Sequence, residues 1–416
     1  MTQRWRIVSG VSLVAGATAL LASPAMTQQA SQPPIARYTI DAGTTSGMGA
    51  MGAGGGAAAA LNMLRGGGGQ FSHELTLRLG STRAPTGAPT ADHFLPSGAR
   101  LGASVPLVTP QRAAATPGGE GTPQQGQMQT PQGRLLLFWG CGERAGPGQP
   151  VIIDFARLAR GEVPPNLYAQ PLNLPDDWTV HQGNSTTYGD WPNQRNSQAV
   201  PANSSLLGPH RIASTYAPEI AFTLADDFMP ALQASGRDVA GTAVALSWNA
   251  LPKATGYYAW AMATNPENAN SRDMVWWSSA STQQFGGPMQ DWLSPAAVGR
   301  LVSAGTVMPP SQTTCTVPAE VRATGGPMLM TFLFGYGPQA DFAYPPRPAS
   351  TRTPWRPEWI ARVRFRASTT LMYGIPGMGG MDQEQAEQGQ PEAPPGLPRC
   401  RGGLRGIAER AAGRCQ

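Results

Sequence analysis

The sequence predicts a mainly β protein, built as one or more antiparallel β-sandwiches with long Gly/Pro-rich loops and one or two short helices. Apolar and polar residues alternate with a period of two over several segments, which is typical of half-buried strands. The 51 glycines and 41 prolines among 416 residues are clustered rather than spread, which indicates long irregular connections. Helical signals are few, so the balance of elements favours a sandwich.

The first 25 residues have the order of a secretory signal peptide. Arg4 and Arg6 precede an uncharged stretch at 7–22, and Ser-Pro-Ala follows at 23–25. A basic region, an apolar region and a small-residue site are the three parts of such a signal. We expect cleavage after Ala25 and an extracytoplasmic mature chain, either periplasmic or secreted; the alternative is an uncleaved anchor. The later sequence predicts no transmembrane span.

Three segments are poor in large apolar residues and divide the chain. Residues 26–70 are rich in Gly and Ala, residues 109–133 in Pro, Gln and Gly, and residues 374–416 form a tail. Such compositions cannot offset the entropy of ordering, so we expect flexible segments. In the tail, an apolar stripe at helical spacing predicts a short amphipathic helix over 404–412. Two β-rich regions remain, 71–237 and 238–373, the second with a final strand at 359–367.

The strands and helices follow in chain order. Alternation predicts strands over Phe71–Leu79 and Met328–Tyr336, and an apolar run predicts a buried strand over Arg134–Trp139. In the final strand, four inward residues alternate with an arginine face; the inward set is Trp359, Ala361, Val363 and Phe365, and the arginines are Arg362, Arg364 and Arg366. Ser294 and Pro295 before an apolar stripe predict a helix near 295–304, and a second short helix is expected near 154–160.

Residues 242–263 carry a recognisable pattern. Val244, Leu246 and Trp248 alternate as one strand, a short turn follows, and Gly256-Tyr257 begins the next strand. This resembles the fibronectin type III pattern, in which a Trp ends one strand and a small-x-Gly-Tyr step begins its neighbour across the sandwich. The resemblance covers about 238–346 and implies a sandwich fold but no function. The long insertion at 265–311 departs from the pattern. The chain as a whole resembles exported bacterial proteins.

The charge of the chain does not indicate a nucleic-acid partner. The formal net charge of +5 falls to +3 when Arg4 and Arg6 are removed with the signal peptide, and the segment 399–416 alone carries five Arg against one Glu. A basic protein binds nucleic acid when its basic residues coat the folded body. Here the excess lies in one tail, so no nucleic-acid partner is expected.

The four cysteines are expected to form disulfides. An exported chain favours pairing, and the absence of a C-x-x-C spacing removes the usual zinc and redox patterns. Four cysteines allow three connectivities. We expect Cys141–Cys315 and Cys400–Cys415 slightly ahead of the alternatives.

No catalytic residues are predicted. The chain has no G-x-S-x-G and no H-E-x-x-H, and its four histidines share no ligand spacing; they are His73, His93, His181 and His210. His73 falls on an apolar strand face, which is more typical of a core or rim histidine than of a base. A hydrolase whose site is assembled from distant residues is the alternative.

Tryptophans supply the leading binding hypothesis. Five of them lie in polar, Gly-rich contexts: Trp178, Trp191, Trp276, Trp277 and Trp292. An indole with one wet end can stack on a sugar ring, so these residues are candidate carbohydrate platforms. The competing interpretation is that they fill loops. Adjacent strand residues point to opposite faces, so only one of Trp276 and Trp277 can face the core.

The methionine pairs and the arginine face suggest two further binding hypotheses. The M-x-x-M pairs Met48/Met51 and Met378/Met381 resemble methionine motifs of copper-handling proteins, since thioethers select Cu(I); low-complexity drift explains them equally well. The arginine face could bind a phosphate-rich partner, or it could block edge pairing of its strand.

The sequence therefore predicts an exported, non-catalytic protein that binds an envelope or extracellular ligand, with a polysaccharide first. No cofactor is expected, and the oligomeric state is left open. The alternatives are the hydrolase and a structural or assembly protein of the cell envelope, for which a large exposed apolar patch without a pocket would be the sign.

Overall fold

The computed structural model describes residues 33–50, 71–110, 133–162, 178–193, 196–239, 241–264, 273–284, 287–350 and 353–374. Over these residues the chain is mainly β, as the alternating pattern predicts. None of the helices in this described part is long and apolar enough to cross a bilayer. The expected signal peptide, the expected helix at 404–412 and the cysteines Cys400 and Cys415 lie outside the described residues.

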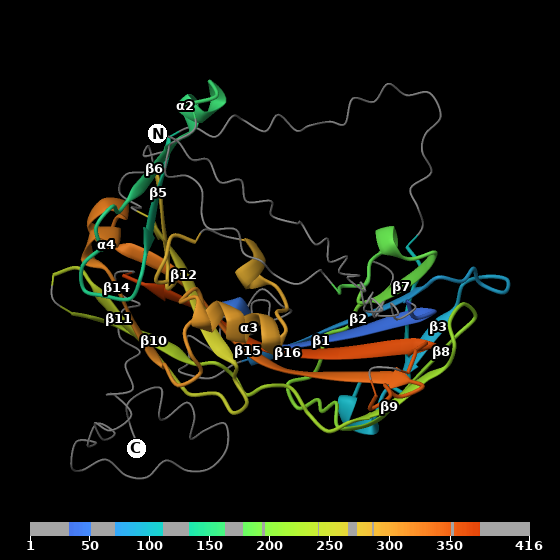
Figure 1. The fold of residues 1–416 in the computed structure, drawn as a ribbon. Helices are drawn as coiled ribbons and strands as arrows, with labels where there is room; N and C mark the ends of the chain where they lie inside the picture. The colour runs from blue at the N-terminus through green and yellow to red at the C-terminus, as the bar shows by residue number, and fades with distance from the viewer. Residues whose placement is uncertain are drawn as a thin grey trace, which may run out of the picture.

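A sheet of nine strands runs through the molecule (Figure 1). From one edge to the other, its strands are β6 (Val151–Asp154), β5 (Arg134–Trp139), β13 (Met274–Ser278), β12 (Gly256–Thr264), β15 (Met328–Tyr344), β16 (Trp359–Tyr373), β1 (Ala36–Gly47), β2 (Phe71–Ser81) and β7 (Thr187–Trp191). The sheet departs from the expected antiparallel pairing at two places, where β1 runs parallel to β16 and β13 runs parallel to β5. Long connections between these partners permit parallel pairing.

Two smaller sheets cover one face of the nine-stranded sheet. One contains β10 (Ala234–Asp238), β11 (Val244–Trp248) and β14 (Thr314–Val317), and the other contains β4 (Val105–Pro106), β3 (Ala91–Phe94), β8 (Gly208–Ser214) and β9 (Ile220–Leu224). Both contribute to a single apolar core with the inward side chains of the large sheet. In Figure 1 they lie at opposite ends of the long strands. The result is a sandwich in which one large sheet faces two small ones.

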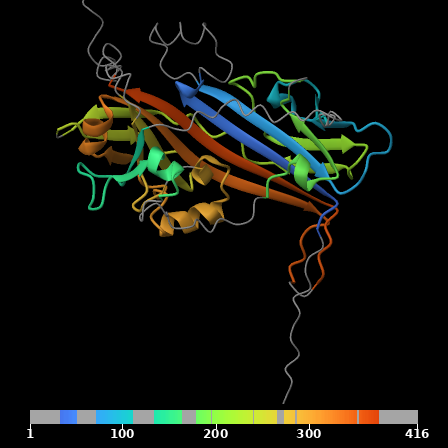
Figure 2. The same cartoon turned by 90° about the horizontal axis from the view of Figure 1, so that it is seen from above.

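Helix α3 (Pro295–Ser303) lies on the opposite face of the large sheet, and Figure 2 shows it across the long strands from the four-stranded sheet. The hydroxyl of Ser294 accepts a hydrogen bond from the Ala297 amide at 3.2 Å, which is the cap that the sequence predicts. Val298 and Leu301 pack on aromatic side chains of β12 and β15. The remaining helices are α2 (Phe155–Ala159) and α4 (Ala319–Gly325), with single 3-10 turns η2 (Ser97–Ala99), η3 (Gln182–Asn184) and η5 (Gly287–Gln290).

Strand β1 corrects the expectation for the N-terminal segment. The composition of residues 26–70 predicts a flexible segment, yet Ala36–Gly47 form a central strand between β2 and β16. Its inward side chains, Tyr38, Ile40 and Ala42, are fully buried in the core. A strand with neighbours on both sides is held by hydrogen bonds as well as by burial, so the glycines near its end do not prevent it from forming.

The large sheet draws strands from both expected β-rich regions. β2, β5, β6 and β7 come from 71–237, whereas β12, β13, β15 and β16 come from 238–373, so the two regions share a sheet and a core. β11 lies in the three-stranded sheet and β12 in the nine-stranded sheet. The resemblance of this segment to fibronectin type III domains stays a prediction.

Candidate functional site

Two of the five candidate tryptophans are core residues. Trp191 at the end of β7 and Trp277 in β13 are fully buried. The Trp277 indole donates to the Gly140 carbonyl at 2.9 Å, and the Trp191 indole donates to Asn196 Oδ1 at 3.3 Å. Neither ring is open to a ligand, because each strand turns it inward. The expectation that these two residues bind carbohydrate is therefore wrong.

Trp276 points to the opposite face from Trp277, as strand alternation requires, but it is part of an aromatic stack. Its ring lies 4.2 Å from that of Trp260, which in turn lies 4.0 Å from Phe332, and all three are nearly parallel. Trp276 is half-buried. It packs between two apolar clusters on the α3 side of the sheet, so its main contribution is to packing.

The structure brings the last two candidates, Trp178 and Trp292, to one place. The guanidinium carbon of Arg362 lies 4.3 Å from the centre of the Trp178 ring, and that of Arg366 lies 4.3 Å from the centre of the Trp292 ring. Both rings are half-buried and come from segments far apart in the chain. We call this set, with Arg364 between the two contacts, the tryptophan–arginine face.

Strand register explains why the arginines line up. Arg362, Arg364 and Arg366 alternate with buried residues on β16, so all three project from the face opposite the small sheets. β16 lies between β15 and β1, which corrects the idea that these charges protect an edge strand. Opposite Arg366 on β1 stands Gly43, where a Cβ would lie 3.3 Å from the Trp292 ring. The absence of a side chain leaves room for that ring.

Arg364 is the anchor of the face. It donates to the buried carboxylate of Asp41 at 2.6 and 3.0 Å, and Arg78 of β2 donates to the same carboxylate at 2.6 Å. Arg364 Nη1 also donates to the Trp292 carbonyl at 3.0 Å. Its Nη2 lies 3.5 Å from the hydroxyl of Thr179, the residue after Trp178. One guanidinium therefore contacts both segments that carry the tryptophans.

Two of the three arginines of the face, Arg362 and Arg364, are ion-paired. Arg362 forms two hydrogen bonds with the Asp341 carboxylate, at 2.8 and 2.9 Å. Arg366 donates to the Gln290 carbonyl, and its burial lowers the pKa of its guanidinium from the ordinary value. The face therefore presents guanidinium donors, two of them ion-paired, beside two indole rings.

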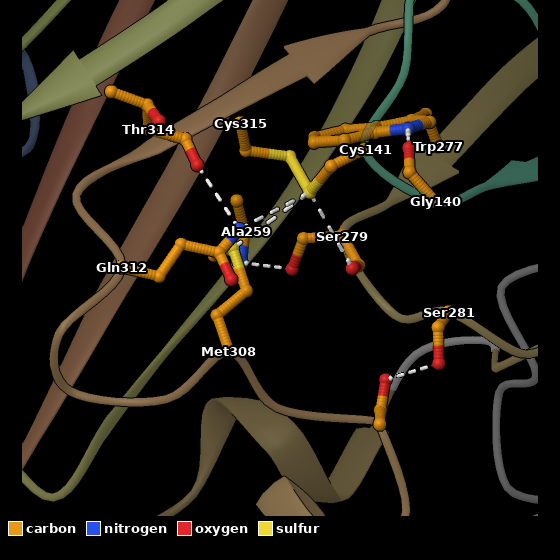
Figure 3. Close-up of a disulfide and its surroundings, with 11 residues drawn as sticks. Gly140, Cys141, Ala259, Trp277, Ser279, Ser281, Met308, Gln312, Thr314 and Cys315 are labelled. Atoms are coloured by element: carbon orange, nitrogen blue, oxygen red, sulfur yellow. Dashed lines mark hydrogen bonds between the residues drawn. A yellow bond between two sulfur atoms is a disulfide. The ribbon is translucent and has the colours of Figure 1, made fainter.

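A separate cavity of about 640 Å³ is lined by Cys141, one half of a disulfide that Figure 3 shows with its neighbours. Cys141 in the loop after β5 is bonded to Cys315 of β14, the pairing that the sequence favours. The half-buried Trp139 lines this cavity with two glutamines. The Trp139 amide donates to Gln149 Oε1 at 2.8 Å, and Gln312 Nε2 donates to the Thr314 carbonyl at 3.0 Å. These polar groups are not predictable from the sequence, because nothing in their spacing indicates that three distant loops meet.

The histidines lie at three separate places: His93 and His210 together in the core, His73 with its Nδ1 3.1 Å from the Thr44 hydroxyl, and His181 at η3. His93 Nε2 and His210 Nδ1 lie 3.0 Å apart in the core, with Tyr38 Oη 2.8 Å from His93 Nδ1. His73 stacks on a phenylalanine ring, and His181 caps η3. Neither the disulfide cavity nor a second cavity of about 420 Å³ beside β3 and β4 is lined by a histidine.

The described part of the chain contains no cluster of three or more His, Cys, Asp or Glu side chains placed to hold a metal ion. Of the copper candidates, Met48 follows β1 and is half-buried, whereas Met51, Met378 and Met381 lie outside the described residues. No protein-family model, curated protein or solved structure matches this chain.

Proposed function

We propose that this protein is exported and binds carbohydrate, without catalysis, through the tryptophan–arginine face. The observation that carries the proposal is the convergence of Trp178 and Trp292 on one row of arginines. Half-buried indoles offer apolar ring surface for stacking beside groups that hydrogen-bond hydroxyls, which is the combination that sugars require.

The spacing of the face favours an oligosaccharide. Arg362 and Arg366 are four residues apart on one strand, a separation of roughly 13 Å at the usual strand rise. A ligand of more than one sugar unit would follow this row of arginines from one tryptophan to the other. We therefore expect affinity to rise with the number of sugar units and to level off once a chain contacts both rings.

Export rests on the order of residues 1–25 and is supported by the Cys141–Cys315 disulfide, because disulfides persist in oxidising compartments. The test is to express the full chain in a bacterial host and determine the N-terminus of the protein recovered outside the cytoplasm. A mature chain that begins at Met26 supports export with cleavage after Ala25. Retention of the full-length chain in the cytoplasm refutes it.

Carbohydrate binding is tested with insoluble polysaccharides and with an oligosaccharide length series in calorimetry. Trp178→Ala and Trp292→Ala should each weaken binding at least about tenfold, equivalent to about 1.4 kcal/mol. Trp355→Ala is the matched control, because Trp355 is also half-buried and also lies near an arginine, Arg347, but sits in the β15–β16 connection. Equal binding by the wild type and both site variants would refute the assignment of this face.

A further inference from the structure

The disulfide between Cys141 and Cys315 is asymmetric in its exposure. Cys315 is 3% exposed and belongs to the core, whereas Cys141 is exposed and lines the 640 Å³ cavity. Figure 3 shows the two sulfur atoms with Cys141 Sγ turned toward Met308 and Gln312. A reagent that enters the cavity therefore reaches one sulfur of the bond and not the other.

The non-covalent contacts of Cys141 Sγ are few and long. Its neighbours are the Ser279 carbonyl at 3.8 Å, Met308 Sδ at 3.9 Å and Gln312 Nε2 at 3.8 Å. These contacts are long, and all three residues line the cavity together with Cys141. The largely exposed guanidinium of Arg144 also lines the cavity; its Nε pairs with the Glu320 carboxylate at 2.7 Å, and its other N–H groups are donors that suit an anionic thiol.

The loop that carries Cys141 has other attachments. The Gly142 amide donates to the Thr316 carbonyl at 2.9 Å, and the Ala319 amide donates to the Glu143 carbonyl at 3.0 Å. Glu320 accepts from the Ala145 amide at 2.9 Å and pairs with Arg144 at 2.7 Å. Cleavage of the disulfide therefore leaves the loop beside β14, with Cys315 still close to Cys141.

We propose that Cys141 is a site of thiol–disulfide exchange with a small anionic thiol. The thiolate attacks Cys141 Sγ, a new sulfur–sulfur bond forms between the thiol and Cys141, and the Cys141–Cys315 bond breaks with its electron pair on Cys315. Attack by Cys315 on Cys141 expels the small thiolate and restores the disulfide. Attack by a second thiolate on the sulfur of the bound thiol gives a small disulfide and the reduced protein.

The experiment uses the folded full chain and reduced glutathione as the probe. The adduct is trapped by acid, and peptide mapping assigns it among Cys141, Cys315, Cys400 and Cys415. We expect an adduct on Cys141 in native buffer, with a rate that is nearly independent of urea below the unfolding transition. A protected disulfide would instead react only from the unfolded fraction, about 10⁻³ to 10⁻⁶ of molecules, and the logarithm of its rate would rise linearly with urea.

An adduct on Cys315, no adduct at either residue, or a rate that follows global unfolding would overturn the proposal. The preference for an anionic thiol is tested with Arg144→Ala, which should slow glutathione about twofold to threefold and leave uncharged 2-mercaptoethanol unaffected. Arg157→Ala is the control, because Arg157 is an exposed, ion-paired arginine of α2 that does not line the cavity. Equal effects of the two variants would overturn the anionic preference.

Discussion

Asp41→Asn tests whether the buried carboxylate holds the tryptophan–arginine face together. The Asp41 side chain is fully buried and accepts two hydrogen bonds from Arg364 and one from Arg78. Three such bonds at about 1.5–3 kcal/mol each would sum to about 4–9 kcal/mol if they were independent. They share one carboxylate, and Arg78 keeps some access to water, so we expect a loss of about 3–5 kcal/mol in the free energy of unfolding.

The assay is urea unfolding followed by tryptophan fluorescence at fixed pH and salt. Asp238→Asn is the matched control, because Asp238 also pairs with an arginine at 2.6 Å but its side chain is 62% exposed. An exposed pair contributes about 0–1 kcal/mol, so the control should be nearly neutral. If Asp41→Asn also costs less than 1 kcal/mol, the reasoning is refuted. The double variant Asp41→Leu/Arg364→Met should be more stable than Asp41→Asn, since it removes the buried Arg364 charge as well and leaves only Arg78, which is 25% exposed, without its partner.

Two further predictions concern stability. The Cys141–Cys315 bond closes a loop with a sequence separation of 174, for which the chain-entropy model gives a stabilisation of about 5 kcal/mol. The variant Cys141→Ser/Cys315→Ser should therefore lose up to about 5 kcal/mol in its free energy of unfolding, measured in urea. A loss below about 1 kcal/mol would contradict the model. Burial lowers the pKa of both His93 and His210, so below pH 6.5 the unfolded chain binds protons that the folded chain does not. The free energy of unfolding should therefore be highest above about pH 6.5 and should fall below it, by up to about 1.4 kcal/mol per pH unit for each histidine. NMR signals of His93 and His210 that titrate near pH 6.5, as in an unfolded chain, would contradict this prediction.

The elements that the sequence predicts well are those whose pattern is local. β2, β5, β15 and β16 follow alternating or continuous apolar runs, and α3 follows a Ser-Pro cap with an apolar stripe. β1 has the same alternation, but the Gly/Ala-rich composition of the residues that follow it favours a flexible segment over a strand. Its parallel pairing with β16 could not be predicted, because the partners lie at opposite ends of the chain and neither sequence encodes the register.

The residue type of the candidate site, tryptophan, could be predicted from the sequence, but which tryptophans belong to the site could not. Tryptophans in polar, Gly-rich contexts included Trp178 and Trp292, yet the same criterion selected Trp191 and Trp277, which are fully buried. The difference depends on strand direction and register, since Trp277 faces inward and its neighbour Trp276 faces outward. The convergence of Trp178 and Trp292 requires two loops to meet over β16, which only tertiary structure determines.

The face of the large sheet opposite the two small sheets is covered in two different ways, by apolar packing and by ion-paired arginines. Where α3 covers it, the outward residues are aromatic, including Trp260, Phe334 and Tyr336, and they form an apolar cluster. Beyond α3 the same face carries paired arginines, although buried ion pairs are often no more stable than apolar packing of similar volume. Because apolar packing already covers this face on the adjacent strands, stability alone does not explain why arginines occupy the rest of it. A ligand that needs directed hydrogen bonds between two indole rings would account for it, which is why Asp41→Leu/Arg364→Met should retain the fold and lose carbohydrate binding.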